Sequence, residues 1–294
     1  MSERDFSVDL HLHTNCSDGV FTPSEAVDYA LKMKLAAISI TDHDSVDAIE
    51  EAARAAKNKG IEIIPGIELS SVAGDPPGEM HILGYYIDYK SESLNKALKE
   101  FKKLRRERAY QILQKLRDNG VALKDESFIE SRADKAIGRL HFAKAMAEEG
   151  FVKSVQEAFQ KYLSQNKPAY APKAALTAQE AINLILKSGG VPIMAHPYYV
   201  HYNDKNMMIS LVKGGLMGLE AWHSKHPEHA VKKFLSMADE LGIIVTGGSD
   251  CHGPYKNEPP VMGRVKVPYC VVENLEKCRD NVCNFMQKTG TFGC

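Results

Sequence analysis

Short runs of apolar, β-branched residues alternate along the chain with longer segments in which apolar residues recur every three or four positions. The short runs predict seven β-strands, near Ser7–Leu12, Ala36–Thr41, Glu62–Ile67, Met80–Tyr86, Val191–Ala195, Gly218–Trp222 and Ile243–Gly247. Helical patterns lie between several of these strands, among them Pro23–Met33 and Ser45–Lys59. Such alternation is typical of parallel strands joined by crossover helices. The sequence therefore predicts an α/β fold whose strands form a closed barrel or a strongly curled sheet.

Both of these helical segments are flanked by residues that typically cap the ends of helices. Thr22 stands at the N-cap of the first segment, followed by Pro23 at the first helical position and Glu25 at the third. Gly60 is predicted to be the C-cap of the second segment, because glycine adopts a left-handed backbone conformation without strain.

The strand–helix rhythm is interrupted between residues 91 and 172, where the patterns are helical and include an amphipathic run from Ser154 to Leu163. We therefore predict a barrel domain of residues 1–90 and 173–294 and a helical insertion of residues 91–172. Near its start the insertion carries a run of cations, Lys99, Lys102, Lys103, Arg105, Arg106 and Arg108, mixed with Glu100 and Glu107. Such a run could guide an RNA strand, but a solvated helix face is the interpretation we favour.

Composition constrains function only broadly. Hydrophobic residues make up 44% and charged residues 26% of the 294, as in ordinary globular proteins. The net charge of −1 excludes a global basic field, so any site for a polyanion must be local. No apolar run approaches the roughly 18 residues that span a bilayer, and the charged stretch Met1–Asp5 is unlike a signal peptide. Six cysteines without a CxxC pair suit reduced thiols, so we expect a cytoplasmic protein without a membrane partner.

Histidine and carboxylate side chains gather at the ends of the predicted strands. His11 and His13 stand two apart at the end of the first strand, which places both rings on one face. The others are Asp18, Asp42, His43, Glu68, His81, His196, Asp250 and His252. In a parallel β/α barrel, residues just past the strands converge on the carboxyl-terminal mouth. His81 fits least well because it stands near the start of its strand, and a reversed fourth strand would remove that difficulty.

A single histidine beside an apolar run is more often an ordinary core or surface residue. The pattern is more informative, since six of the eleven histidines lie at strand ends. Neutral imidazoles and ionised carboxylates that meet from separate elements form strong metal sites. The sequence therefore predicts a site for several divalent metal ions, and its ligands suit manganese, iron and zinc alike.

Taken in order, these motifs resemble those of the PHP (polymerase and histidinol phosphatase) superfamily. The resemblance runs through His11-Leu12-His13, Thr41-Asp42-His43, Gly66-Ile67-Glu68, His81, Ala195-His196-Pro197 and Ser249-Asp250-Cys251-His252. It spans nearly the whole chain. It implies a distorted (β/α)7 barrel and a metal-dependent phosphoesterase with three divalent ions of Mn²⁺, Fe²⁺ or Zn²⁺.

The same resemblance implies how the ligands are shared. The first metal would be held by His11, His13, Glu68 and Asp250, the second by Glu68, His81 and His196, and the third by Asp18, His43 and His252. Asp42 would orient His13 or a neighbouring ligand, unless it is a simple turn residue at its strand end. Cys251 would pack against its neighbours rather than bind a metal.

The insertion resembles one branch of the superfamily, the nucleotide and oligoribonucleotide phosphoesterases. Members of that branch remove the 3′-phosphate of nucleoside 3′,5′-bisphosphates or degrade short RNA from its 5′ end. The likeness runs through Gly138–Phe142, Phe159–Leu163 and Lys167–Tyr170. It implies that the insertion caps the substrate, that Arg139 and Lys167 bind its 5′-phosphate, and that His226 contacts the phosphate to be cleaved. The ordinary alternatives are a helix-end arginine, a loop lysine, and His223 or His229 in place of His226.

For the reaction, the hypothesis is a metal-bridged hydroxide that attacks phosphorus in line. Glu68 bridges two metals, and His226 or a metal-bound water gives a proton to the leaving oxygen. The substrate would be a small phosphorylated nucleotide or a short oligoribonucleotide, with no stable duplex nucleic acid, and no protein partner can be inferred. The nearest alternative is a histidinol-phosphate phosphatase of the same superfamily. A regulatory domain with a degraded site and a hydrolase of C–N bonds are more remote.

Overall fold

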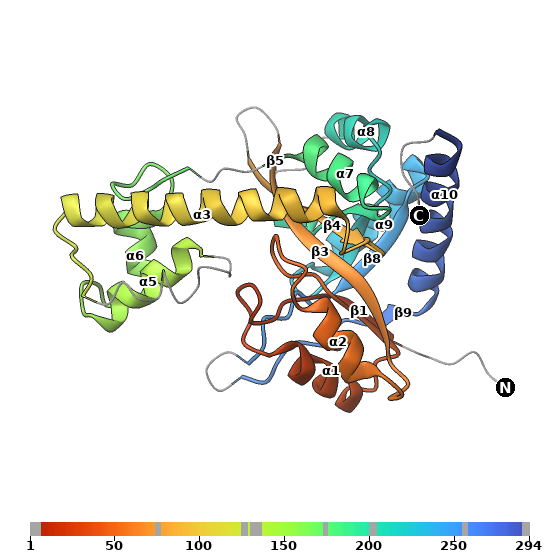
Figure 1. The fold of residues 1–294 in the computed structure, drawn as a ribbon, viewed down its shortest axis with the longest axis horizontal. Coiled ribbons are helices and arrows are strands. Elements are labelled where there is room, and N and C mark those ends of the chain that lie inside the picture. Colours follow the sequence, from red (N-terminus) through yellow and green to blue (C-terminus); the bar gives the residue numbers. More distant parts are fainter. Residues whose placement is uncertain are drawn as a thin grey trace. The chain divides into compact units, whose positions relative to one another are not determined.

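The computed structural model describes residues 7–73, 78–124, 129, 137–172, 176–199, 205–254 and 258–289. The chain divides into two compact units. The first, called the barrel unit below, comprises Met1–Asn95 and Ala175–Cys294, and the second, the helical unit, comprises Lys96–Ala174. Helix α3 (Glu92–Asp118) begins in the barrel unit and continues into the helical unit (Figure 1).

Seven longer strands of the barrel unit occupy the predicted positions. They are β1 (Ser7–Leu12), β2 (Ala37–Ile40), β3 (Glu62–Ala73), β4 (Gly78–Tyr85), β6 (Val191–Met194), β7 (Gly218–His223) and β8 (Ile244–Gly248). The sheet order is β8-β7-β6-β4-β3-β2-β1-β9, in which the short β9 (Val267–Pro268) pairs with β1, while the short β5 (Leu176–Thr177) pairs with β3. Beyond β8, the Asp250 amide donates to the His11 carbonyl (2.9 Å) and the His13 amide to the Cys251 carbonyl (3.0 Å). These bonds nearly close the sheet, and the predicted α/β fold of the distorted (β/α)7 type is confirmed.

Strand β4 runs against its neighbours. It pairs antiparallel with both β3 and β6, whereas the β1–β2–β3 and β6–β7–β8 pairings are parallel. Strand β3 also continues to Ala73, beyond the predicted end at Ile67, because its second half forms a hairpin with β4 in which Ala73 lies opposite Gly78. The reversed fourth strand that His81 required is therefore present.

The first predicted helix is confirmed with its cap. In α1 (Pro23–Lys32) the Thr22 hydroxyl accepts from the Glu25 amide (3.2 Å), and the Glu25 carboxylate accepts from the Thr22 amide (2.8 Å). The second predicted helix, Ser45–Lys59, was too long at both ends, since α2 covers only Ile49–Ala56. The prediction that Gly60 caps it was wrong. Lys57 is the C-cap, and the chain turns at once because Asn58 takes a left-handed φ of 63°.

Helices cover the outside of the barrel unit (Figure 1). They are α1 and α2 beside β1 to β3, and α7 (Ala178–Lys187), α8 (Lys205–Lys213), α9 (Glu228–Leu241) and α10 (Cys270–Thr289) over the remaining strands. Their buried faces are apolar, as in α7, where Ala181, Ile182 and Ile185 are fully buried. No described helix is long and apolar enough to cross a membrane. The polar groups described next are therefore held inside an apolar shell.

The helical unit has an apolar core of its own. Besides α3 it contains α5 (Arg139–Glu148), α6 (Val155–Ala158) and a single π-helical turn, η1 (Phe159–Leu163). Phe142, Met146 and Leu163 are fully buried in its core. Arg108, the last cation of the basic run, is itself only 8% exposed and donates to the Ala171 carbonyl (2.9 Å). This arginine therefore anchors the return of the chain and does not belong to a solvated face.

Candidate metal centre

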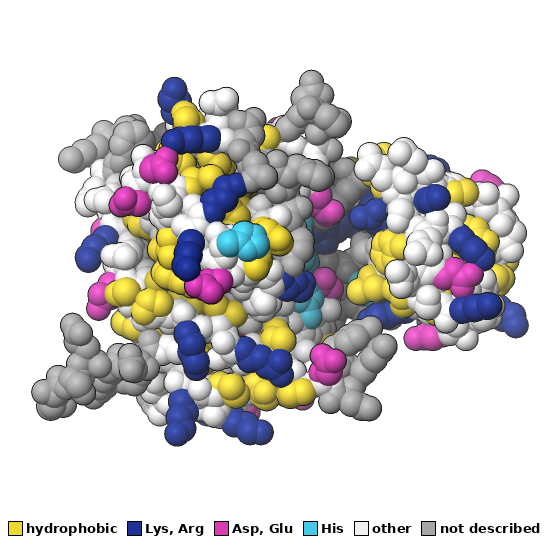
Figure 2. Space-filling view, turned by 180° about the vertical axis from the view of Figure 1, so that it is seen from behind, with side chains coloured by type: hydrophobic (Ala, Val, Ile, Leu, Met, Phe, Trp, Pro, Cys, Tyr) yellow, Lys and Arg dark blue, Asp and Glu magenta, His cyan; other side chains and the backbone are white. Residues whose placement is uncertain are grey.

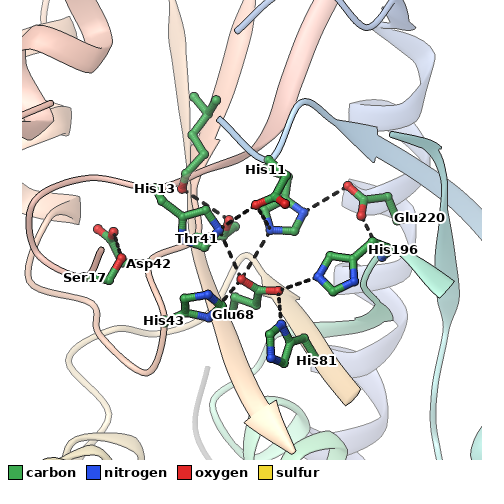
Figure 3. Close-up of polar contacts among 12 residues, drawn as sticks. His11, His13, Ser17, Thr41, Asp42, His43, Glu68, His81, His196 and Glu220 are labelled. Atoms are coloured by element: carbon green, nitrogen blue, oxygen red, sulfur yellow. Dashed lines mark hydrogen bonds and ion pairs between the residues drawn. The ribbon is translucent and has the colours of Figure 1, made fainter. Parts of the chain in front are cut away.

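The carboxylate of Glu68 is the centre of the barrel mouth. It lies within β3, is fully buried, and is surrounded by imidazole rings from four separate parts of the chain (Figure 3). Its Oε2 lies 3.3 Å from His11 Nε2, 3.1 Å from His13 Nε2 and 3.1 Å from His43 Nδ1. Its Oε1 lies 2.8 Å from His81 Nδ1 and 3.1 Å from His196 Nε2. Five imidazoles thus share one carboxylate.

The strand topology explains this convergence. Side chains at alternate positions of a strand share a face, so Glu68 and Ser70 point the same way from β3. His81 lies directly opposite Ser70 on the reversed β4, which places its ring diagonally across from Glu68. His43 follows β2 and forms an isolated bridge with Glu68. Reversal of a single strand therefore brings a residue from the start of that strand to the mouth where the others end.

Two further carboxylates complete the cluster. Asp250 Oδ1 lies 3.2 Å from His13 Nε2 and 3.7 Å from His11 Nε2. Asp18 Oδ1 lies 3.3 Å from His252 Nε2 and 3.7 Å from His13 Nδ1. All nine predicted ligands are therefore brought together.

Ligand atoms within 4.8 Å of one another form several groups that could hold a metal ion: His13, Asp18, His43 and His252; His11, His13 and Asp250; Glu68, His11 and His196; Glu68, His43 and His81; and His11, Glu220 and His223. The first two resemble the predicted third and first sites. The predicted second site is divided, because His81 groups with His43 and His196 groups with His11. The fifth group was not predicted.

Two of these ligands have a positive φ, as do five other non-glycine residues among those described. His196 has a φ of 26° and Asp250 a φ of 55°, although neither is a glycine. Residues held in this region cost on the order of 1–3 kcal/mol each and persist where the surroundings enforce them. The fold therefore imposes these two ligand positions at a cost in stability.

The chemistry of the cluster fits divalent metal ions. His11 Nε2, both ring nitrogens of His13, His43 Nδ1 and Glu68 Oε2 are buried and make no hydrogen bond among the described residues. Buried polar atoms without such partners are rare in folded proteins and often mark the place of an ion. Imidazole nitrogens and carboxylate oxygens are also the ligands that manganese, iron and zinc accept. The residues present therefore suit a cluster of such ions.

The pKa values in the cluster are shifted by burial and by the close approach of imidazoles and carboxylates. Burial alone would raise the pKa of Glu68, but the surrounding imidazoles outweigh it and hold the pKa well below its usual value. Burial lowers the pKa of His43 well below its ordinary value, so this ring is the neutral imidazole that metals bind. For His13, burial is outweighed by Asp250 and Glu68, which raise the pKa to about 10. A metal at His13 must therefore displace a proton.

A family model of the PHP domain matches residues 9–171, which is more than half of the chain. The chain belongs to the PHP domain family. It is 32% identical over 252 residues to a 3′,5′-nucleoside bisphosphate phosphatase from Chromobacterium violaceum, covering 84% of this chain and 88% of that protein. It is 34% identical over 261 residues to the 5′-3′ exoribonuclease Rnm from Escherichia coli, covering 86% of this chain and 88% of that protein.

Solved structures agree with this family. The fold matches a crystal structure from Bifidobacterium adolescentis that is named for a metal-dependent phosphoesterase, with a TM-score of 0.81 and 28% identity. That match covers 93% of this chain and 96% of the other. The resemblance to the PHP superfamily drawn from the sequence motifs is therefore confirmed.

Asp42 of this PHP domain is hydrogen-bonded to the loop between two predicted ligands. Its Oδ1 accepts from the Thr14 amide (2.7 Å) and the Ser17 hydroxyl (2.5 Å), and its Oδ2 accepts from the Thr14 hydroxyl (2.6 Å). Both oxygens are thus used by the loop that leads from His13 to Asp18, and Figure 3 shows the contact with Ser17. These hydrogen bonds hold the loop that presents Asp18, so Asp42 stays predicted to orient a neighbouring ligand.

Two residues of β7 contact predicted ligands of the PHP domain: Glu220, which was missed from the sequence, and His223, which was considered only in place of His226. Glu220 is fully buried, and its Oε1 lies 3.0 Å from His11 Nδ1. His223 Nε2 lies 3.4 Å from Asp250 Oδ2. A signal did exist, because Glu220 is a charged residue inside the otherwise apolar run Gly218–Trp222, and such a residue is seldom buried without a partner.

Cys251 and His226 occupy distinct environments. Cys251 is buried in an apolar cluster with Leu12 and Met262, and burial raises the pKa of its thiol. His226 Nδ1 lies 2.9 Å from the Ala221 carbonyl oxygen, which can only accept, so Nδ1 carries the proton and Nε2 the lone pair. Burial also lowers the pKa of His226. Cys251 thus packs as expected, and His226 is a neutral ring with an acceptor nitrogen.

The two predicted phosphate-binding residues lie in the helical unit. Arg139 begins α5, and its guanidinium lies 5.7 Å from the ring centre of Tyr170 and 5.9 Å from that of Phe159. It also donates to the Leu163 carbonyl (3.4 Å), directly before the turn that carries the exposed Lys167. A guanidinium within about 6 Å of two aromatic rings is attracted by their faces, which favours one placement of the side chain. Within the helical unit, Arg139 is therefore an oriented cation.

Proposed function

We propose that this chain is a metal-dependent phosphoesterase that hydrolyses phosphate esters of nucleotides. The substrates would be nucleoside 3′,5′-bisphosphates, which lose their 3′-phosphate, short 5′-phosphorylated RNA, or both. One observation carries the proposal: the carboxylate of Glu68 lies within 3.3 Å of five imidazole rings. An apolar core would stabilise the fold better than such a cluster, because burying charged groups is costly.

The substrate class is supported by the names of the relatives. One is named for nucleoside bisphosphates and the other for RNA, and neither of these two is named for histidinol phosphate. Arg139 and Lys167 stay predicted to bind the 5′-phosphate. The contacts of Arg139 with Tyr170 and the Leu163 carbonyl support this, since a guanidinium held in place binds a terminal phosphate through two parallel hydrogen bonds.

We propose three divalent ions of manganese, iron or zinc, held by the nine predicted ligands. When bound, these ions supply charge for the phosphoryl oxygens and activate water at neutral pH. The chain supplies the geometry: Glu68 stands between the ligand groups, and the strained backbones of His196 and Asp250 fix two of them. The Asp42 bonds to Thr14 and Ser17 hold the loop that presents Asp18.

His226 is better suited to accept a hydrogen bond than to give a proton. Its proton lies on Nδ1 and is donated to the Ala221 carbonyl, so Nε2 offers a lone pair. Protonation of Nε2 would create a cation in a site where burial already lowers the pKa. We therefore propose that His226 accepts a hydrogen bond from a hydroxyl or a protonated oxygen of the substrate, in place of the proton donation predicted from the sequence.

The test is a comparison of substrates with the manganese-loaded protein. We expect hydrolysis of adenosine 3′,5′-bisphosphate and of short 5′-phosphorylated RNA, with a kcat/KM at least about tenfold above that for histidinol phosphate, a difference of roughly 1.4 kcal/mol. Equal or better hydrolysis of histidinol phosphate would replace the proposed substrate class. Absence of all hydrolysis by protein that holds its metals would support a regulatory role instead.

A further inference from the structure

Glu220 touches ligands of two different groups in the metal centre. Its Oε1 lies 3.0 Å from Nδ1 of His11, and its Oε2 accepts a hydrogen bond from the backbone amide of His196 (2.8 Å) (Figure 3). His11 comes from β1 and His196 follows β6, so this carboxylate connects elements far apart in the sequence. Glu220 is fully buried on β7 and reaches both through its two oxygens.

The contact with His11 selects which ring nitrogen faces the centre. Both oxygens of Glu220 are engaged, since Oε2 accepts from the His196 amide and Oε1 lies 3.0 Å from Nδ1 of His11. An ionised carboxylate only accepts hydrogen bonds, so Nδ1 of His11 must carry the proton. In the neutral ring, Nε2 then keeps the lone pair, and it is the atom that lies near Glu68 (3.3 Å) and Asp250 (3.7 Å). His11 is therefore presented in the tautomer that can bind a metal through Nε2.

The contact with His196 supports a strained ligand. The backbone of His196 has a φ of 26°, which a non-glycine residue rarely adopts. Its amide is fixed by Glu220, and its ring Nε2 lies 3.1 Å from Glu68. Without a fixed amide, the chain at this position could relax to an ordinary φ and carry the ring away from Glu68.

The same strand holds a further ligand through a bulge. The register of β7 against β8 shifts between Glu220 and Trp222, so Glu220 and His223 both face the cluster although they are an odd number of residues apart. The Lys225 amide donates to His223 Nδ1 (3.2 Å), which leaves the proton of the neutral ring on Nε2, 3.4 Å from Asp250 Oδ2. His223 thus presents a proton to Asp250. The group of His11, Glu220 and His223 is better explained as support for ligands than as a fourth metal site.

We infer that Glu220 is a positioning residue that couples two metal positions, through the His11 tautomer and the His196 backbone. The inference rests on the metal centre proposed above, but not on its substrate. Among the described residues, those of the third predicted position, Asp18, His43 and His252, make no hydrogen bond or ion pair with Glu220. Loss of Glu220 should therefore weaken two positions and spare the third.

The main test is Glu220→Gln, with Glu62→Gln as the matched control. A glutamine keeps the size of the side chain but replaces one acceptor by a donor, so it opposes the proton either of His11 or of the His196 amide. Glu62 is the first residue of β3 in the same sheet. It accepts a hydrogen bond from the Tyr269 hydroxyl (2.8 Å), away from the metal centre. Manganese and zinc binding to the purified proteins is measured by titration calorimetry, with bound metal counted after dialysis.

We expect Glu220→Gln to bind metal roughly 10- to 100-fold more weakly at two positions, as is usual when a partner of a metal ligand is removed. One position should keep its affinity, and Glu62→Gln should match the unsubstituted protein. A purely structural role for Glu220 would lower the thermal midpoint of the metal-free protein and leave all affinities unchanged, which overturns the inference. Uniform weakening at every position also overturns it.

Two further measurements keep the test decisive. The ¹⁵N shifts of the histidine rings in metal-free protein should show His11 protonated on Nδ1, and this pattern should change in Glu220→Gln but not in Glu62→Gln. If Glu220→Gln does not fold, Glu220→Asp keeps the charge but is too short to reach both partners. Wild-type metal affinity in Glu220→Asp would overturn the inference. Normal metal binding with no nucleotide hydrolysis would count against the proposed substrate and leave this coupling in place.

Discussion

The mouth of the barrel and the core of the helical unit bury different kinds of side chain. At the mouth, Glu68, His11 and His13 are almost fully buried, and several of their atoms have no hydrogen-bond partner among the described residues. The buried cluster of the helical unit consists of aliphatic and aromatic side chains such as Ile112, Phe142 and Met146. The helical unit is thus stabilised by apolar packing, whereas the mouth needs bound cations to offset the cost of its buried polar groups.

One face of the molecule carries exposed charges of both signs. On the face shown in Figure 2, lysine and arginine side chains are interspersed with acidic and apolar ones. The buried histidine and carboxylate groups, in contrast, gather at the barrel mouth. Changes at the mouth should alter metal binding and activity, and changes in the helical core should alter stability alone.

The largest effect is expected for Glu68→Gln. The amide removes the charge that five imidazoles share, so at least two metal positions should be lost and kcat/KM should fall on the order of 10³-fold or more. Metal content and steady-state rates measure this. The control is Glu51→Gln, a glutamate of the same unit that bonds the Ser24 hydroxyl (2.7 Å) and touches no ligand. Full metal content in Glu68→Gln would refute its central position.

Phe142→Ala should act in the opposite way. Phe142 is fully buried in the helical unit, and its truncation should cost about 3–5 kcal/mol in the free energy of unfolding of that unit. Denaturant unfolding followed by hydrogen exchange would show which unit is affected. Leu140→Ala, on the same helix but 39% exposed, should cost much less. A drop in metal content of folded Phe142→Ala would contradict the separation between the two regions.

The sequence identifies the residues that cluster at the barrel mouth because most of them lie near a recognisable strand end. Histidines two apart, as in His11 and His13, mark a shared face without knowledge of the fold. His81 was predicted despite standing at the wrong end, and the reversed β4 explains its position. The family motifs added the order of the ligands.

The sequence pattern did not predict which side chains far apart along the chain contact one another. The partners of Asp42 lie in a preceding loop, and which side chain it bonds depends on how that loop folds back. The role of Glu220 depends on a bulge in β7 that changes which side chains share a face, and no local pattern reveals a bulge. The end of α2 was also missed, because Asn58 took the left-handed position that glycine more often fills.

Removal of metal should separate the two regions at equilibrium. At a free metal concentration 100 times the dissociation constant, bound metal adds about 2.7 kcal/mol to the stability of the unit that binds it. Chelation should therefore increase hydrogen exchange around β1, β3 and β6, and leave the exchange of α5 unchanged. Equal responses in both units would show that the helical unit also depends on the metals.

The smallest of these effects is expected for Arg139→Ala. If this guanidinium binds a 5′-phosphate, its loss should remove about 2 kcal/mol, or roughly 30-fold in kcat/KM, for substrates that carry that phosphate. Adenosine 3′-monophosphate, which lacks it, should be hydrolysed at the same rate by the variant and the unsubstituted protein.

Two variants of the same helix separate charge from geometry. Lys144→Ala removes an exposed cation of α5 and should change neither substrate. Arg139→Lys keeps the charge but loses the paired hydrogen bonds and the planar stacking on Tyr170, so it should recover only part of the loss. Full recovery by lysine would mean that a diffuse positive charge suffices. Equal losses on both adenosine substrates would mean that Arg139 acts on the fold of the helical unit and not on the 5′-phosphate.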